Sequence, residues 1–167
     1  MSNLTATLRL QHLFISNLVE AAQWIGVEKL EAQRKLRAAK THLLAHFKLE
    51  DTLLYPVLFE AAQKNVELKY TLEFLAKDMM GVSKEVMNFL EQCHIGGTHR
   101  HTTKDIANIL FLLQTRIRRE EDTLFAEFDR IKAASRITVA SQITDSHRSI
   151  SAFSHSNHHA GATTSTP

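Results

Sequence analysis

The chain has 167 residues, enough for one domain with a sizeable core. Its 20 basic and 18 acidic residues nearly cancel, so the net charge favours neither nucleic acid nor a membrane surface as a partner. The single cysteine, Cys93, excludes an intramolecular disulfide framework and suits a reducing compartment, so we expect a cytoplasmic protein. No apolar run approaches ~20 residues and the N-terminus has no long apolar core, which predicts neither a membrane span nor a signal peptide.

The low content of glycine and proline, five and two residues, favours an all-α fold. The first predicted helix covers residues 3–25 and ends before Gly26, a residue type that commonly stops helices. Its inner stripe consists of Leu4, Leu8, His12, Ile15 and Val19. One histidine therefore interrupts an apolar face. Such a histidine is more often a satisfied core residue than a metal ligand, and both interpretations stay open at this point.

The second predicted helix covers residues 27–63 and carries the most informative stripe. Positions at steps of three or four along it are Leu36, Ala39, Leu43, His46, Glu50, Leu53 and Val57. His46 and Glu50 lie one turn apart in the middle of this face, where an unpaired polar group is costly. A metal ion is a suitable partner, because it binds imidazole and carboxylate together. Pro56 predicts a kink or a break near residues 52–55.

A third helix is predicted over residues 66–93, with Asn65 as its cap. Its stripe contains no histidine and consists of Leu68, Leu72, Leu75, Met79, Val82, Val86 and either Phe89 or Leu90. Two glycines then predict a loop over residues 94–101. The histidines of this loop match no closed zinc pattern, so we interpret it as an exposed polar loop.

Thr102 and Asp105 resemble a capping box that opens a fourth helix over residues 103–134. Charge again lies in the middle of its stripe, at Glu120. The full stripe is Ile106, Ile109 or Leu110, Leu113, Arg116 or Ile117, Glu120, Leu124 and Phe128. This arrangement parallels that of the second helix.

The composition changes near residue 135, after which serine, threonine, alanine and histidine dominate. We therefore expect a four-helix domain over residues 1–134 and a Ser/Thr/His-rich tail over residues 135–167. Because residues 141–167 have no sustained apolar period, we expect that part of the tail to be disordered.

The second and fourth predicted helices contain the same pattern. The repeat aligns His46-x-x-x-Glu50-Asp51-x-x-Leu54-Tyr55 with Arg116-x-x-x-Glu120-Glu121-x-x-Leu124-Phe125. Two helix hairpins related by a pseudo-twofold axis would form a four-helix bundle, in whose centre Glu50 and Glu120 approach each other. Metal sites in bundle cores are built in this way, from side chains on facing helices.

This pattern resembles the hemerythrin-like family, also called the HHE cation-binding domain, over residues 4–131. The resemblance implies an antiparallel up-down four-helix bundle in which histidines and carboxylates of all four helices hold two irons. The ligand positions that carry over are His12, His46, Glu50 and Glu120. The two histidines of the family's third helix correspond to Leu75 and Met79, and that of the fourth helix corresponds to Arg116.

The altered ligand set leaves two hypotheses open. In the first, the four remaining ligands hold iron in a mononuclear or incomplete di-iron site; two histidines with carboxylate suit Fe(II) or Zn(II), and dioxygen or another small ligand could reach open positions. In the second, Arg116 replaces the metal charge and no cofactor is bound. An arginine cannot become a ligand, but its guanidinium could hold Glu50 and Glu120 by forked hydrogen bonds.

The leading functional hypothesis is a hemerythrin-like cation-binding module that senses or binds oxygen or reports redox state. The alternative is a metal-free regulatory bundle that acts through a protein partner. No nucleophile–base pair or phosphate-binding loop occurs in the sequence, so we expect no enzymatic activity.

Overall fold

The computed structural model describes residues 1–93 and 102–137. It divides into two units, Met1–Asp129 and Arg130–Pro167, and the described part of the second unit, residues 130–137, is helical. The described residues contain helices and turns but no strand, which confirms the all-α class predicted from composition. The loop at 94–101 and the predicted disorder of 141–167 lie outside the described residues.

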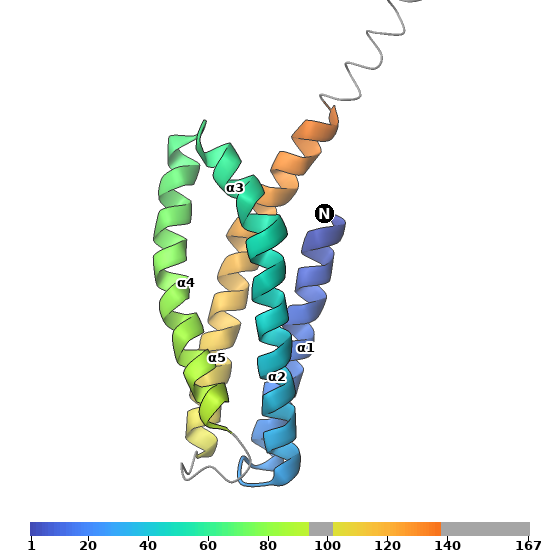
Figure 1. Cartoon of the computed structure of the whole chain (residues 1–167), viewed down its shortest axis with the longest axis vertical. Helices are drawn as coiled ribbons and strands as arrows, with labels where there is room; N and C mark the ends of the chain where they lie inside the picture. The colour runs from blue at the N-terminus through green and yellow to red at the C-terminus, as the bar shows by residue number, and fades with distance from the viewer. Residues whose placement is uncertain (94–101, 138–167) are drawn as a thin grey trace, which may run out of the picture. The chain divides into compact units, whose positions relative to one another are not determined.

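The first unit is a bundle of four helical rods (Figure 1). The first rod is α1 (Asn3–Ile25), and the third is α4 (Val66–Gln92). The second rod comprises α2 (Leu30–Leu49), the π-helix η1 (Glu50–Leu54) and α3 (Tyr55–Ala62). The fourth comprises α5 (Thr103–Arg119), the π-helix η2 (Glu120–Leu124) and helical residues 125–129.

The helix ends follow from local hydrogen bonding. Asn65 accepts a hydrogen bond from the Leu68 amide, and Thr102 forms a reciprocal capping box with Asp105, which confirms both predicted caps. Gly26 ends α1 with a φ of 95°, a conformation that side chains disfavour. The second rod begins at Leu30 rather than at 27, because residues 26–29 form this turn.

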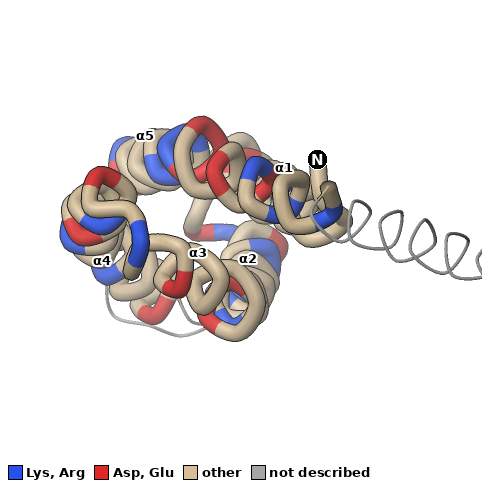
Figure 2. Tube along the Cα trace, turned by 90° about the horizontal axis from the view of Figure 1, so that it is seen from above, with Lys and Arg blue, Asp and Glu red and all other residues tan. Residues whose placement is uncertain are grey.

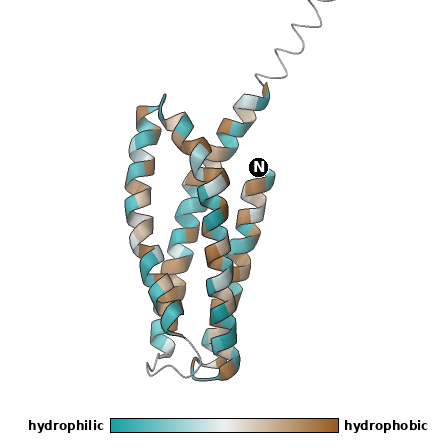
Figure 3. Cartoon of the chain, viewed as in Figure 1, coloured by the Kyte–Doolittle hydropathy of each residue, from teal (hydrophilic) through white to brown (hydrophobic). Residues whose placement is uncertain are grey.

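Seen along the bundle, α1 lies beside α2 and α5, and α4 lies beside the same two helices, so the rods surround one interior (Figure 2). Hydrophobic residues recur at intervals along every rod (Figure 3). The core therefore occupies the space between the rods. Its largest cluster contains Ile15, Val19, Ala22, Val27, Ala32, Leu36, Ala39, Leu43, Val86, Phe89, Leu90, Cys93, Ile106, Ile109 and Leu113.

The start of α1 differs from the predicted stripe, because Thr5 is buried and Leu4 only partly so. The Thr5 hydroxyl donates to Asp129 at 3.0 Å, and the Ser2 amide donates to the same carboxylate at 2.6 Å. Burial raises the pKa of the Asp129 carboxyl, but the hydrogen bonds from Ser2 and Thr5 and the charge of the N-terminus together outweigh it and hold this pKa below its usual range. A polar contact therefore fixes the end of α1 where the sequence predicted an apolar one.

The predicted stripe of the second rod fails after Glu50. Leu53 is 50% exposed, whereas Leu54 and Leu58 are fully buried. A π-helix places an extra residue in its turn, so the inward position moves from 53 to 54 across η1. Pro56 lies in the first turn of α3, next to the predicted kink. The matching η2 contains no proline, so proline alone does not account for these turns.

Leu43 tests the interior of the bundle, because it is 2% exposed in the main cluster while its neighbour Leu44 is 49% exposed. We expect Leu43→Ala to lower the free energy of unfolding by ~2–5 kcal/mol, since it leaves a cavity. Leu44→Ala is the matched control and should change it by less than ~0.5 kcal/mol. Denaturant unfolding measures both, and equal losses in the two variants would contradict this packing.

Candidate metal centre

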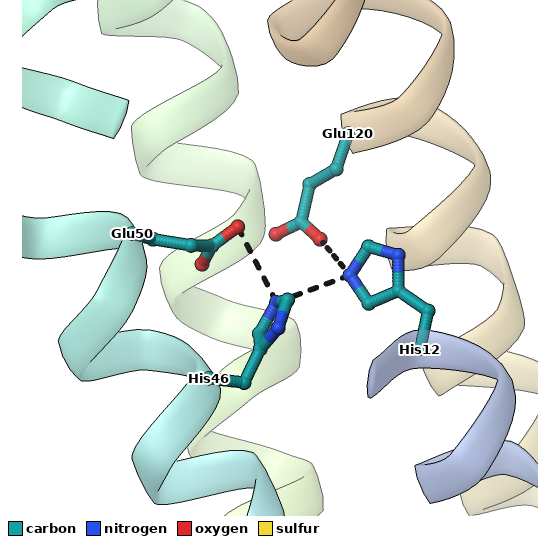
Figure 4. Close-up of side chains that lie close together, drawn as sticks. All are labelled: His12, His46, Glu50 and Glu120. Carbon is teal, nitrogen blue, oxygen red and sulfur yellow. Dashed lines mark hydrogen bonds and ion pairs between the residues drawn. The ribbon is translucent and has the colours of Figure 1, made fainter. Parts of the chain in front are cut away.

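All four residues that the resemblance selects as ligands meet in the middle of the bundle (Figure 4). Each offers one ligand atom, and these atoms lie within 4.8 Å of one another. His12 comes from α1, His46 from α2, Glu50 from η1 and Glu120 from η2. All four side chains are buried.

The two halves of the sequence repeat have the same local structure. His46 lies in the last turn of α2 and Glu50 is the first residue of η1. Arg116 lies in the last turn of α5 and Glu120 is the first residue of η2. Each glutamate thus begins a π-helix, a feature often found at functional sites. The sequence repeat placed these residues opposite each other, but it gave no sign of the π-helices.

The two imidazoles face each other at hydrogen-bonding distance. His12 Nε2 lies 3.0 Å from His46 Nε2 and 3.1 Å from Glu120 Oε2. His46 Nε2 is also 3.4 Å from Glu50 Oε1. A proton or another cation between these atoms is therefore favoured over two opposed lone pairs.

Three of the four carboxylate oxygens have charged neighbours but accept no hydrogen bond from the described residues. Within the described part of the chain, no group donates a hydrogen bond to Glu50 Oε1 or to either oxygen of Glu120. Glu120 Oε1 nevertheless lies 2.5 Å from an Arg116 nitrogen and forms an ion pair with it. The angle at the donor does not meet the requirement for a hydrogen bond. Buried carboxylate oxygens without donors are costly, and they are typical of sites that accept a cation.

Arg116 joins the two carboxylates, as the second hypothesis expected, but not by a fork. A single nitrogen, Nη2, approaches both Glu120 Oε1 and Glu50 Oε2, the latter at 3.3 Å. The other arm, Nη1, turns toward α4, where it donates to the Ser83 hydroxyl and, at 3.4 Å, to the Met79 carbonyl. The guanidinium carbon lies 4.5 Å from the Phe47 ring centroid, a cation–π distance.

The third rod contributes no ligand among its described residues. Leu75 and Met79, the positions that the resemblance aligned with histidines, are buried as apolar side chains. The space beside them is taken by the Arg116 arm that bonds to Met79 and Ser83. The loop histidines at 94, 99 and 101 lie outside the described residues.

Two partners of the histidines were not identified from the sequence. Glu121 Oε1 lies 2.9 Å from His12 Nδ1, and Gln11 Oε1 lies 3.0 Å from His46 Nδ1. Glu121 occupies the same place in the repeat as Asp51, which is exposed. The sequence shows an acidic residue directly after Glu50 and another after Glu120, but the pattern could not indicate which of the two reaches a histidine.

A pocket of about 250 Å³ lies beside the centre. Its lining consists of Phe47, Glu50, Asp51, Tyr55, Ala76, Met79, Met80, Ser83 and Arg116. Glu50 and Arg116 thus belong both to the cluster and to the pocket. A small molecule in the pocket would contact the polar centre on one side and methionine and aromatic side chains on the other. Burial and the nearby carboxylates raise the pKa of the Tyr55 hydroxyl, which therefore stays protonated.

Charge at the centre also affects His12. Burial alone would lower the pKa of this imidazole, but the nearby carboxylate of Glu120, followed by that of Glu121, outweighs burial and raises it. Without a metal, the ring therefore binds a proton more strongly than it does in the unfolded chain.

This raised pKa predicts a pH dependence of stability. The stabilisation is fully present below the unfolded pKa of about 6.5 and is lost as pH rises through the folded value. In chelator, we expect the free energy of unfolding to fall as the pH rises from about 6.5 through the raised folded pKa of His12. His12→Ala should lose this slope, and denaturant unfolding across the range measures it. A slope that persists in His12→Ala would assign the effect to another group.

The described helices include none that is both long and apolar enough to cross a membrane. Comparisons with family models, with curated proteins and with solved structures returned no match to this chain.

Proposed function

We propose that this protein is a hemerythrin-like cation-binding module, an antiparallel up-down bundle that holds a single divalent transition-metal ion, with iron as the first candidate. The ligands are His12, His46, Glu50 and Glu120, whose ligand atoms lie within 4.8 Å of one another. The observation that carries the proposal is the set of three buried carboxylate oxygens that accept no hydrogen bond beside two facing imidazole nitrogens. Such a donor set fits a metal ion.

Charge supports one ion rather than two. Glu50 and Glu120 are anionic, and Arg116 compensates one of them. With neutral histidines, the centre then keeps one uncompensated negative charge in a buried place, which a cation would offset. A second ion would compete with the Arg116 guanidinium and would find only Leu75 and Met79 on α4.

The ligand set and the pocket support a role in binding or sensing. Two histidines with carboxylates suit Fe(II) or Zn(II), and a four-ligand ion keeps room for a small molecule. When bound, iron would supply reversible redox and ligand-binding chemistry for dioxygen or a similar ligand. The pocket of about 250 Å³ reaches Glu50 and Arg116 and offers an approach for it. The proposed role is non-enzymatic.

A second candidate is favoured by the Arg116 contacts themselves. The guanidinium lies 3.3 Å and 2.5 Å from the two carboxylates, and a proton on His12 could provide the remaining positive charge. The bundle would then be a metal-free regulatory protein that acts through a protein partner. Metal content separates the two candidates.

The test is elemental analysis of the full chain expressed with added iron and purified without chelator. We expect a single equivalent of metal in the wild type and loss of most of it in His46→Ala. His42→Ala is the matched control, because His42 is exposed on the same helix, and its metal content should be unchanged. Metal-free wild-type protein would favour the second candidate, and equal loss in His42→Ala would contradict this ligand assignment.

A further inference from the structure

The two histidines of the centre are held from outside by side chains of unequal charge. His12 Nδ1 faces the carboxylate oxygen of Glu121 at 2.9 Å, whereas His46 Nδ1 faces the amide oxygen of Gln11 at 3.0 Å. Both oxygens can only accept a hydrogen bond, so each favours the tautomer of its ring that carries the proton on Nδ1. In that tautomer the Nε2 lone pair is directed into the cluster, where the two Nε2 atoms lie 3.0 Å apart and a cation between them is favoured over two opposed lone pairs.

Glu121 is itself held in place by Arg9. One guanidinium nitrogen of Arg9 pairs with Glu121 Oε2, and the other donates to the Glu121 backbone carbonyl at 3.2 Å. Phe125 packs against both partners of Glu121. Its ring stacks on the His12 ring at 5.4 Å and lies 5.5 Å from the Arg9 guanidinium carbon. The remaining oxygen, Oε1, is thereby aimed at His12.

Gln11 provides a weaker version of the same contact. Its side chain is neutral, and a hydrogen bond to an ionised carboxylate is roughly twice as strong as one between neutral groups. His12, which donates to Glu121, should therefore be held more firmly than His46, which donates to Gln11.

We propose that Glu121 is the positioning residue of this centre. It fixes His12 with Nε2 directed inward and makes His12 the anchoring ligand, while His46, held by Gln11, is the weaker ligand. The part concerning metal rests on the proposed function. The orientation of the rings can be measured without any metal, so the two ideas can fail separately.

The first measurement is nitrogen NMR of metal-free, full-length protein labelled at histidine, recorded at alkaline pH. In the wild type we expect His12, whose partner is the charged Glu121, to carry its proton on Nδ1. The proton of His46 should be shared between its two nitrogens, because two opposed Nε2 lone pairs are disfavoured. Glu121→Ala should give His12 a mixture of tautomers, whereas Gln11→Ala should leave the proton of His12 on Nδ1. Glu121→Gln should keep the wild-type tautomer, because its amide oxygen still accepts. An unchanged His12 tautomer in Glu121→Ala would overturn the proposal.

The second measurement is the affinity for Zn(II), by competition with a chromogenic chelator. Glu121→Ala should weaken binding by about 10–100-fold, the usual effect of removing such a partner, and Gln11→Ala should weaken it less. The control is Asp122→Ala, which removes an exposed acid next in the chain and should leave affinity unchanged. An equal loss of zinc affinity in Asp122→Ala would show that the effect arises from the net negative charge nearby, and it would overturn the positioning role of Glu121. A wild type that binds no zinc would contradict the proposed function, while the tautomers would still decide the positioning role.

Discussion

Arg116→Ala should lower the free energy of unfolding of the metal-free protein by ~3–5 kcal/mol. The guanidinium is only 8% exposed and lies between Glu50 and Glu120, which are 1% and 0% exposed. Removing it leaves two buried carboxylates near each other without their fixed cation. It also removes the donor to Ser83 and the packing on Phe47. Denaturant unfolding in the presence of chelator measures the loss.

The control for this variant is Arg118→Ala, an exposed arginine two residues along the same helix. It should change stability by less than ~0.5 kcal/mol. A mild effect of Arg116→Ala, similar to that of Arg118→Ala, would mean that the carboxylates are compensated in another way, and the charge balance proposed for the centre would be wrong.

Arg116→His should raise the affinity for iron by at least about tenfold, a change comparable to that produced by altering a partner of a metal ligand. The substitution replaces a cation that cannot bind metal with an imidazole one turn before Glu120, as His46 stands before Glu50. The α5–η2 half would then match the α2–η1 half. Anaerobic titration with Fe(II), followed by elemental analysis, measures both affinity and stoichiometry.

Arg116→Gln separates the two possible causes of this gain in iron affinity, the loss of a positive charge and the addition of an imidazole ligand. It removes the same positive charge and adds no imidazole, so any gain it shows arises from charge alone. We expect Arg116→His to exceed it. Equal binding by both variants would contradict a ligand role for a histidine at this position, and unchanged binding in both would show that the guanidinium does not compete with metal.

Most of the fold followed from apolar periodicity. The stripe of α4 was predicted correctly because its helix keeps one period from Leu68 to Leu90. The inward-facing stripe of the second rod was predicted correctly only as far as Glu50, because the π-helix that follows shifts the inward face by one residue. Neighbouring helices decide such a shift, and the hydrophobic pattern of a single segment does not contain that information.

The centre was predictable where polar residues interrupt an apolar stripe. His12, His46, Glu50 and Glu120 all interrupt apolar stripes in this way, and the family resemblance selected these four as ligands. Glu121 and Gln11 were not found, because each lies beside the stripe and reaches a ring only through its side-chain conformation and the rotation of its helix. The single-nitrogen contact of Arg116 was missed for the same reason.

The most direct test of the central claim is anomalous diffraction at the iron edge from crystals of protein grown with iron. The account predicts one strong peak between His12, His46, Glu50 and Glu120, with Arg116 still beside the two carboxylates. The absence of a peak at this position, or a peak found only at the histidines of residues 94–101, would contradict it.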